Sequence, residues 1–215
     1  AIESIMAINY DNFELIIVDD CSSEETNVVL FEAQRKFPKI TTIRLPNNFG
    51  SSKAREIGLR ASTGNFIFFT DDDDTVLPNR ISKPLDFIIT HPTLDVVYCN
   101  FNLINDNLEV IPIFCQPFDF EAYLELEFNI GLGILFGRRD VFLSVPFYSI
   151  FDRATDYDWV FRMLRHGYKI DLCPEIVMNY NRSGSINQHL AGTSDSIEKH
   201  KEIYNREKLL KEFSK

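Results

Sequence analysis

Short apolar runs alternate with longer amphipathic segments over the first part of the chain. The runs Leu15–Val18 and Phe66–Phe69 contain only Leu, Ile, Val and Phe, which is typical of strands that are buried on both faces. Glu24–Lys36 and Ser51–Ala61 place apolar residues at helical spacing, and a short strand is predicted between them at Thr41–Arg44. This alternation indicates an α/β fold with a mostly parallel central sheet flanked by helices.

The pattern is less regular after residue 74. Residues 115–150 are rich in aromatic side chains without a clear period, and loops over a rigid sheet are where a second substrate is usually selected. We therefore expect one domain over residues 1–190, with a smaller region on the side of the second substrate, and a helical extension over 191–215. The later elements predicted are a helix at Asn79–Thr90, a strand at Leu94–Cys99, a hairpin strand at Glu109–Phe114 after the polar turn Asn105–Asn107, a helix at Asp156–His166, and strands at Tyr168–Leu172 and Ile176–Tyr180.

Two of the apolar runs lead into clusters of carboxylates. Phe66–Phe69 is followed after Thr70 by the four residues Asp71–Asp74, and Leu15–Val18 is followed by Asp19 and Asp20. Ligands bind beyond the carboxyl ends of parallel strands, and right-handed crossovers bring both strand ends to one edge. Four adjacent like charges repel by a few kcal/mol at an effective dielectric of about 20, so we expect a divalent cation there. The alternative is an acidic turn that faces water.

Composition and charge narrow the function further. The 215 residues are 45% hydrophobic, enough for a sizeable core, and the formal charge of −10 argues against binding to nucleic acid. The four cysteines have no paired spacing, which suits a reducing compartment. No run approaches the ~20 apolar residues of a membrane span, and no signal peptide is recognisable. We therefore expect a cytoplasmic protein, with peripheral association at the inner face of the membrane as one option.

The order and spacing of these motifs resemble glycosyltransferase family 2. Glu14–Thr26 is similar to the family segment in which a glutamate, an apolar strand and two aspartates precede a helix. Asn48–Gly64 resembles the helix before the family's D-x-D-D metal motif, which here is Asp71–Asp74. Thr155–Arg162 is similar to the family's E-D-x-D-L-x-x-R helix. The resemblance extends over roughly residues 1–185 and is far more specific than any single motif.

This resemblance implies a GT-A fold and an inverting, metal-dependent glycosyltransferase of the hexosyl or N-acetylhexosaminyl type. The implied donor is a nucleotide-diphosphate sugar, with UDP as the nucleotide, and the implied acceptor is a glycan or lipid-linked sugar in surface polysaccharide biosynthesis. Mn²⁺ or Mg²⁺ is the implied cofactor, because both prefer oxygen ligands. The implied site residues are Asp20, Arg55, Asp71 and Asp72 for the nucleotide sugar, Asp71 and Asp73 for the metal, and Asp156 as the catalytic base.

Several of these residues also have a structural interpretation. Asp20 can stabilise a helix N-terminus through the helix dipole, Arg55 can be a surface cation, and Asp156 can be a helix cap. Two other functions stay open at this point. A sugar nucleotidyltransferase shares metal-binding carboxylates and a parallel nucleotide-binding sheet, and a non-catalytic domain would bind a nucleotide sugar without turnover.

The chain departs from the family pattern at three places. The family's first strand has no counterpart in this sequence, so we expect a segment before Ala1 and an open position beside Glu14–Val18. Thr155 replaces the glutamate that normally precedes the catalytic aspartate. The family's Arg-x-His near the end of the domain is replaced by Tyr180–Ser185, in which Arg182 is a candidate substitute. At a helix N-terminus, Asp156 is expected to keep a pKa low enough for the carboxylate to be ionised at neutral pH.

Overall fold

We describe the protein from a computed structural model, which defines residues 1–124, 128–147 and 155–181. The predicted extension at 191–215 and the predicted role of Arg182 lie outside these described residues. The helices are α1 (Ile2–Met6), α2 (Glu24–Lys36), α3 (Ser51–Ala61), α4 (Ser82–Thr90), α5 (Phe120–Leu124), α6 (Arg139–Ser144) and α7 (Thr155–Arg165), with a 3-10 turn at Leu132–Ile134. The strands are β1 (Leu15–Asp19), β2 (Ile40–Arg44), β3 (Phe66–Phe68), β4 (Thr75–Val76), β5 (Val96–Ile104), β6 (Val110–Ile113), β7 (Leu135–Arg138) and β8 (Ile170–Asn181).

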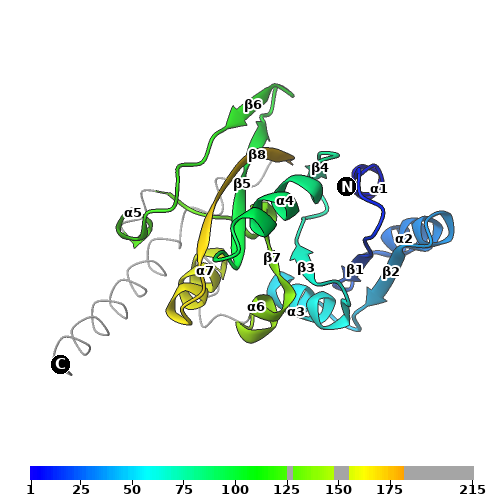
Figure 1. The fold of residues 1–215 in the computed structure, drawn as a ribbon. Coiled ribbons are helices and arrows are strands. Elements are labelled where there is room, and N and C mark those ends of the chain that lie inside the picture. The colour runs from blue at the N-terminus through cyan, green and yellow to red at the C-terminus, as the bar shows by residue number, and fades with distance from the viewer. Residues whose placement is uncertain (125–127, 148–154, 182–215) are drawn as a thin grey trace.

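The described strands form two sheets (Figure 1). β1 and β2 pair in parallel, and the larger sheet has the order β3-β7-β5-β8-β4, with β6 paired to β5. Within the larger sheet β5 and β8 are parallel, whereas the β3–β7, β4–β8, β5–β6 and β5–β7 pairs are antiparallel. The α/β class with flanking helices is as predicted, but the sheet is mixed rather than mostly parallel. Parallel neighbours need a crossover connection, whereas β6 follows β5 through a hairpin and is therefore antiparallel to it.

The boundary between the two sheets lies between β1 and β3. In the described part of the chain, β1 pairs only with β2, and β3 pairs only with β7. Helix α3 packs closely on β1, since a Cβ added at Gly58 would lie 3.2 Å from Val18 Cγ2. Figure 1 shows β1, β2 and α2 to one side of the central strands. One edge of β1 therefore has no strand partner among the described residues, and a preceding strand at this edge stays a prediction.

Strand β8 replaces the two short strands that were predicted. Its pairing with β5 shifts register where Cys99 lies opposite Cys173 but Asn100 lies opposite Ile176. Pro174 falls in this shift, and proline is tolerated in a sheet mainly at such irregular positions because it has no N–H to donate. The strand therefore continues through a bulge to Asn181. The backbone N–H of Asn181 lies 3.0 Å from Asp74 Oδ1, so the end of β8 reaches the acidic segment.

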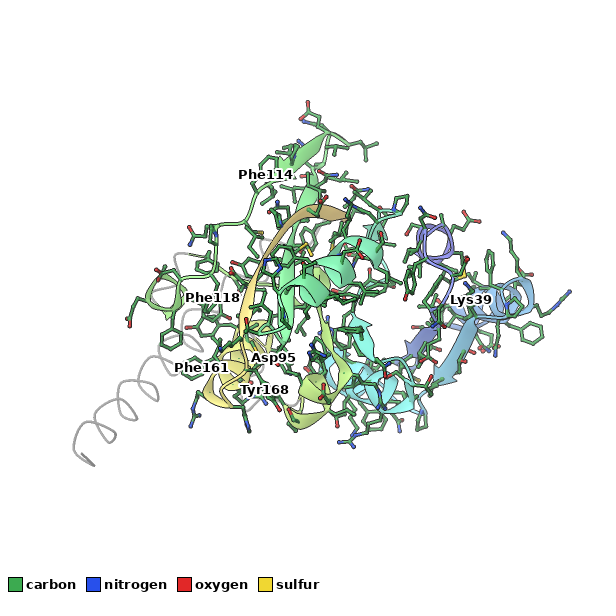
Figure 2. The ribbon with its side chains drawn as sticks, in the orientation of Figure 1. Lys39, Asp95, Phe114, Phe118, Phe161 and Tyr168 are labelled. Carbon is green, nitrogen blue, oxygen red and sulfur yellow. The ribbon has the colours of Figure 1, made fainter. Side chains whose placement is uncertain are left out.

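The predicted hairpin is present and projects from the central sheet (Figure 1). The Asn105 side-chain oxygen accepts hydrogen bonds from the backbone N–H groups of Asn107 and Glu109, each at 3.0 Å, and these close the turn. The hairpin carries exposed apolar side chains. Figure 2 labels one of them, Phe114, which follows β6 and is 72% exposed.

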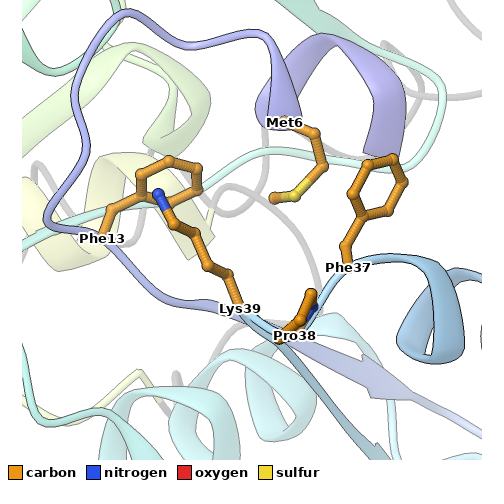
Figure 3. A pocket seen from close by; sticks show the side chains of 5 residues that line it. All are labelled: Met6, Phe13, Phe37, Pro38 and Lys39. Carbon is orange, nitrogen blue, oxygen red and sulfur yellow. The ribbon is translucent and has the colours of Figure 1, made fainter.

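The core surrounds β5 and β7 and continues into α7. Trp159 is fully buried, stacks on Phe142 with ring centroids 4.8 Å apart, and donates from Nε1 to the Val145 carbonyl at 2.8 Å. Trp159 is therefore a core residue. A separate apolar pocket of about 200 Å³ opens beside α1, where the Lys39 ammonium lies over the Phe13 ring (Figure 3).

Candidate active site

The acidic segment Asp71–Asp74, which follows β3, contains two kinds of carboxylate. Asp71, Asp72 and Asp73 are exposed, whereas the Asp74 side chain is buried and accepts a hydrogen bond from the Asn181 backbone N–H at 3.0 Å. The pKa of Asp74 is raised to about 6, mainly by burial and also by the three neighbouring carboxylates, against the lowering effect of the Asn181 N–H. Asp74 therefore fastens the segment to the end of β8, and the other three carboxylates are available to a ligand.

Arg55 connects this acidic segment to α3. Its Nη2 lies 2.8 Å from Asp71 Oδ1, and its side chain is only 16% exposed. The positive charge of Arg55 also lowers the pKa of Asp156, so the guanidinium lies near both carboxylates. The structure thus brings Arg55, Asp71 and Asp156 together, and the interpretation of Arg55 as a surface cation does not apply.

Asp156 lies in the first turn of α7. Its Oδ2 accepts a hydrogen bond from the Leu132 backbone N–H at 3.2 Å, and its Oδ1 accepts one from Thr155 Oγ1 at 3.3 Å. Burial raises the pKa of Asp156, and the Arg55 charge and the Leu132 N–H offset this only in part. Burial therefore outweighs the helix terminus in setting the direction of the shift, and ionisation of Asp156 at neutral pH stays a prediction. A carboxylate with a raised pKa is a more efficient general base at neutral pH, because its pKa lies closer to that pH.

Asp20 lies just beyond the carboxyl end of β1. Its two carboxylate oxygens accept hydrogen bonds from the backbone N–H groups of Phe49 and Gly50, each at 2.7 Å. The cap of α2 is Ser23, which accepts a hydrogen bond from the Thr26 N–H at 3.5 Å, so the interpretation of Asp20 as a helix cap is not supported. Asp20 instead fixes the turn that opens α3, and each oxygen keeps a second lone pair for a ligand.

Tyr180, the first residue of the segment that replaces the family's Arg-x-His, lies near the end of β8 and belongs to the same site. Burial raises the pKa of the Tyr180 hydroxyl, and the nearby negative charges of Asp74, Asp73, Asp71 and Asp156 raise it further, in that order of size. The Tyr180 ring packs edge-on against Phe101 at 6.2 Å between centroids. Tyr180 therefore lies among the acidic segment and the Asp156 carboxylate at the end of β8.

The exposed carboxylates fit a hard divalent cation. Asp71 and Asp73 supply oxygen ligands, which suit Mg²⁺ or Mn²⁺. One Asp71 oxygen contacts Arg55 and leaves the other free for a metal. Within the described residues, no group of three or more His, Cys, Asp or Glu side chains is arranged as a complete metal site. A cation held by Asp71 and Asp73 would need further oxygen ligands, and Mg²⁺ usually keeps several waters.

An acidic strand end, an arginine that bridges to it and a buried carboxylate thus lie together on a mixed α/β sheet. The family model described as "Glycosyl transferase family 2" matches residues 1–154. The chain belongs to this family and is a glycosyltransferase by class. The matched segment ends just before α7, so the role of Asp156 depends on its motif and its surroundings.

Known relatives agree with this class, and a solved structure agrees with the fold. The chain is 29% identical over 212 residues to an uncharacterized glycosyltransferase of Haemophilus influenzae, covering 94% of this chain and 71% of the relative. It is 29% identical to the Escherichia coli UDP-Glc:alpha-D-GlcNAc-diphosphoundecaprenol beta-1,3-glucosyltransferase WfgD, covering 73% of this chain and 60% of WfgD. The structure of Staphylococcus aureus TarS residues 1–349 in complex with UDP-GlcNAc superimposes with a TM-score of 0.70 at 18% identity, over 88% of this chain and 55% of that one. This similarity confirms the GT-A fold.

Among the described residues, no helix combines the length and the apolar character needed to cross a bilayer.

Proposed function

We propose that the protein is an inverting, metal-dependent glycosyltransferase that moves a sugar from a UDP-sugar to a lipid-linked glycan acceptor during surface polysaccharide assembly. The observation that carries the proposal is the group formed by Arg55, Asp71 and Asp156. It combines a cation, an exposed carboxylate at a strand end and a buried carboxylate of raised pKa. Sugar transfer from a nucleotide diphosphate needs these three kinds of group at one place.

The names of the relatives support the donor and the acceptor. WfgD is named for a UDP-glucose donor and a diphosphoundecaprenol-linked acceptor, and TarS was solved with UDP-GlcNAc. Other relatives are named for colanic acid and teichuronic acid biosynthesis, in Escherichia coli and Bacillus subtilis. The chain spans 60% of the length of WfgD and 55% of the TarS chain. Transfer to a polyprenyl-linked acceptor would take place at the inner face of the membrane.

The donor would be held along the edge formed by β1, β3 and α3. We assign Asp20 to the uracil N–H, since its oxygens keep free lone pairs at the end of β1. Asp71 and Asp73 would hold Mn²⁺ or Mg²⁺, with Asp72 near the sugar or ribose. A cation bound there would neutralise the diphosphate and stabilise it as a leaving group. Arg55 adds a second positive charge on the same side.

Asp156 would act as the general base. In direct displacement the acceptor hydroxyl attacks the anomeric carbon, its proton passes to an Asp156 carboxylate oxygen, and the bond from the anomeric carbon to the UDP oxygen breaks. Attack from the face opposite the leaving group inverts the configuration. The hydrogen bond from Leu132 holds the carboxylate in one orientation. The raised pKa makes Asp156 a stronger proton acceptor than an exposed aspartate.

A donor screen tests the proposal. The purified protein would be incubated with UDP-glucose, UDP-galactose and their N-acetylamino counterparts, each with a polyprenyl-diphosphate sugar acceptor and with or without Mn²⁺. We expect UDP release from one donor, dependent on both the acceptor and Mn²⁺. Formation of a nucleotide sugar from UTP and a sugar phosphate, with release of pyrophosphate, would instead identify a nucleotidyltransferase. Tight binding of a UDP-sugar without turnover would identify a binding domain.

A further inference from the structure

Arg80 is a fully buried arginine that precedes α4. Its Nη2 donates to three backbone carbonyls, those of Gly133 at 2.7 Å, Leu135 at 2.9 Å and Phe69 at 3.5 Å. The guanidinium carbon lies 4.6 Å from the centroid of the Phe68 ring. Nε and Nη1 have no hydrogen-bond partner among the described residues, and no carboxylate there forms an ion pair with the guanidinium.

Such an environment is costly for a cation. Burial lowers the pKa of Arg80 to about 10, so the side chain is still charged at neutral pH. A buried charge without a counter-charge destabilises a fold, and an apolar residue of similar volume is often at least as stable. Packing alone therefore gives no reason for an arginine here. The carbonyls that it binds point to a different role.

The carbonyls of Gly133 and Leu135 belong to the segment that contacts the proposed base. The Leu132 N–H donates to Asp156 Oδ2 at 3.2 Å. On the other side, a Cβ added at Gly133 would lie 3.9 Å from Asp74 Oδ2. The segment 131–135 thus passes between the Asp156 carboxylate and the buried end of the acidic segment.

The third carbonyl, that of Phe69, comes two residues before Asp71. One guanidinium therefore contacts both the residue that leads into the acidic segment and the 131–135 segment, whose Leu132 N–H binds Asp156. The two parts are far apart in sequence, and within the described residues Arg80 is the side chain that hydrogen-bonds to both Phe69 and Gly133.

We propose that Arg80 is a positioning residue that fixes the 131–135 segment against the acidic segment and thereby holds Asp156 at a set distance from the bound donor. This inference rests on the proposed function, because it takes Asp156 as the base and the acidic segment as the donor site. Arg80 touches neither substrate nor metal in this account. It acts through the Gly133 and Leu135 carbonyls and the Leu132 N–H.

Three variants separate this role from a general structural one. Arg80→Met keeps the length of the side chain but removes the donors and the charge, and Arg80→Lys keeps the charge and some donors. Ile88→Ala is the control, since Ile88 is fully buried in α4 and contributes packing without a hydrogen bond to the turn. For each variant, UDP affinity and stoichiometry in Mn²⁺ would be measured by calorimetry, together with kcat, KM for the donor and the thermal midpoint.

We expect Arg80→Met to bind UDP with full stoichiometry and an affinity close to that of the wild type, with kcat lowered by about 10- to 100-fold, the scale of a small misplacement of a catalytic group. Arg80→Lys should recover part of that loss. Ile88→Ala should lower the thermal midpoint while kcat per UDP-binding molecule stays near the wild-type value. The proposal is overturned if Arg80→Met keeps its kcat, or if kcat and binding stoichiometry fall together in both Arg80→Met and Ile88→Ala.

Hydrogen exchange at the Leu132 amide gives a reading that does not depend on activity. The amide should exchange faster in Arg80→Met than in the wild type, and Ile88→Ala should leave it protected. If the wild-type protein transfers no sugar, the proposed function fails, and the exchange result still decides whether Arg80 fixes the turn. Unchanged protection of Leu132 in Arg80→Met would refute the positioning role by itself.

Discussion

The Asp156 carboxylate experiences two opposing influences. Burial favours its neutral form, whereas the Arg55 charge and the Leu132 N–H favour its anion. Burial has the larger effect, so the pKa of Asp156 is raised. Asp156→Asn would keep an oxygen that accepts from Leu132 while losing the basic lone pair. We expect sugar transfer to fall by roughly 10²-fold or more, the usual effect of a lost general base. Steady-state rates of UDP release with donor and acceptor measure this.

Asp158 provides the matched control for that variant. It lies two residues further along α7, is buried, and contacts Arg162 Nε at 2.8 Å through Oδ2. Asp158→Asn should lower stability through the weakened ion pair while keeping most of the turnover per folded molecule. UDP affinity in Mn²⁺ should be nearly unchanged in Asp156→Asn. Near-normal turnover of that variant would remove Asp156 as the base.

Glu14 gives a prediction about pH. Burial alone would raise the pKa of Glu14, but hydrogen bonds from the Thr63 N–H and hydroxyl and from the Gly64 N–H outweigh it, with help from the Arg139 charge, and lower the pKa. A lowered pKa in the folded state stabilises the fold above the unfolded pKa, near 4.5. That contribution is lost as the pH falls through the lower folded value.

Glu14→Gln should therefore destabilise the protein most at neutral pH. The difference in the free energy of unfolding between wild type and variant should stay constant above about pH 5, near the unfolded pKa of a glutamate, and shrink as the pH falls below it. Urea denaturation at pH 7, 5 and 3.5 measures the difference. A difference of the same size at all three values would show that the charge of Glu14 plays no part.

At the residue scale, the sequence predicts those site residues that lie in contiguous motifs. Asp71 follows an apolar run and Asp156 lies in a helix motif that resembles the family's, so contiguous motifs are enough to predict both. Arg80 could not be predicted, because an arginine near a helix start is usually exposed. Its burial results from carbonyls 53 and 55 residues away in the chain. Tyr180 is likewise brought to the site by the pairing of β8 with β5.

At the element scale, the same division between local and distant causes applies. Helices α2 and α3 have the predicted bounds, because spacing and caps within a dozen residues determine them. The direction of β7 and the continuity of β8 could not be predicted, because both depend on pairing with β5. The close contact between β5 and β7 can be tested directly.

Gly137 in β7 permits that close contact. A Cβ at this position would lie 2.8 Å from Val96 Cγ2, 3.0 Å from the Asp95 carbonyl oxygen and 3.1 Å from Val96 Cα. Because two of these atoms belong to the backbone, Gly137→Ala must displace a strand. We expect it to lower the free energy of unfolding by about 1–3 kcal/mol, the range for overpacking a core. Urea denaturation would measure this.

Gly131→Ala is the control for that substitution. The nearest atom to its added Cβ is Asp156 Oδ2 at 3.7 Å, an ordinary van der Waals distance. Its effect on stability should be within about 0.5 kcal/mol, as for substitutions that create no clash. Equal losses in the two variants would show that the Gly137 contact is not what limits the spacing of β5 and β7.

At the scale of the whole molecule, we expect charge to govern how the proposed donor binds. The chain has a formal charge of −10, and Asp71, Asp72 and Asp73 are exposed where the diphosphate is proposed to lie. UDP that binds without a cation would add negative charge to this acidic edge, and a cation that binds without UDP would lack phosphate ligands. Each ligand should therefore strengthen the binding of the other, by the same factor in both directions.

We expect Mn²⁺ to raise the affinity for UDP by about 5- to 150-fold, the usual range of such coupling. Calorimetry of UDP with and without Mn²⁺, and of Mn²⁺ with and without UDP, measures both sides of the cycle. Asp73→Asn should remove most of the coupling, whereas Asp106→Asn, in the exposed hairpin turn, should preserve it because it changes the net charge equally outside the site. Equal UDP affinity with and without Mn²⁺ in the wild-type protein would exclude a metal at the acidic segment. An equal loss of coupling between UDP and Mn²⁺ in Asp73→Asn and Asp106→Asn would show that the coupling depends on net charge instead.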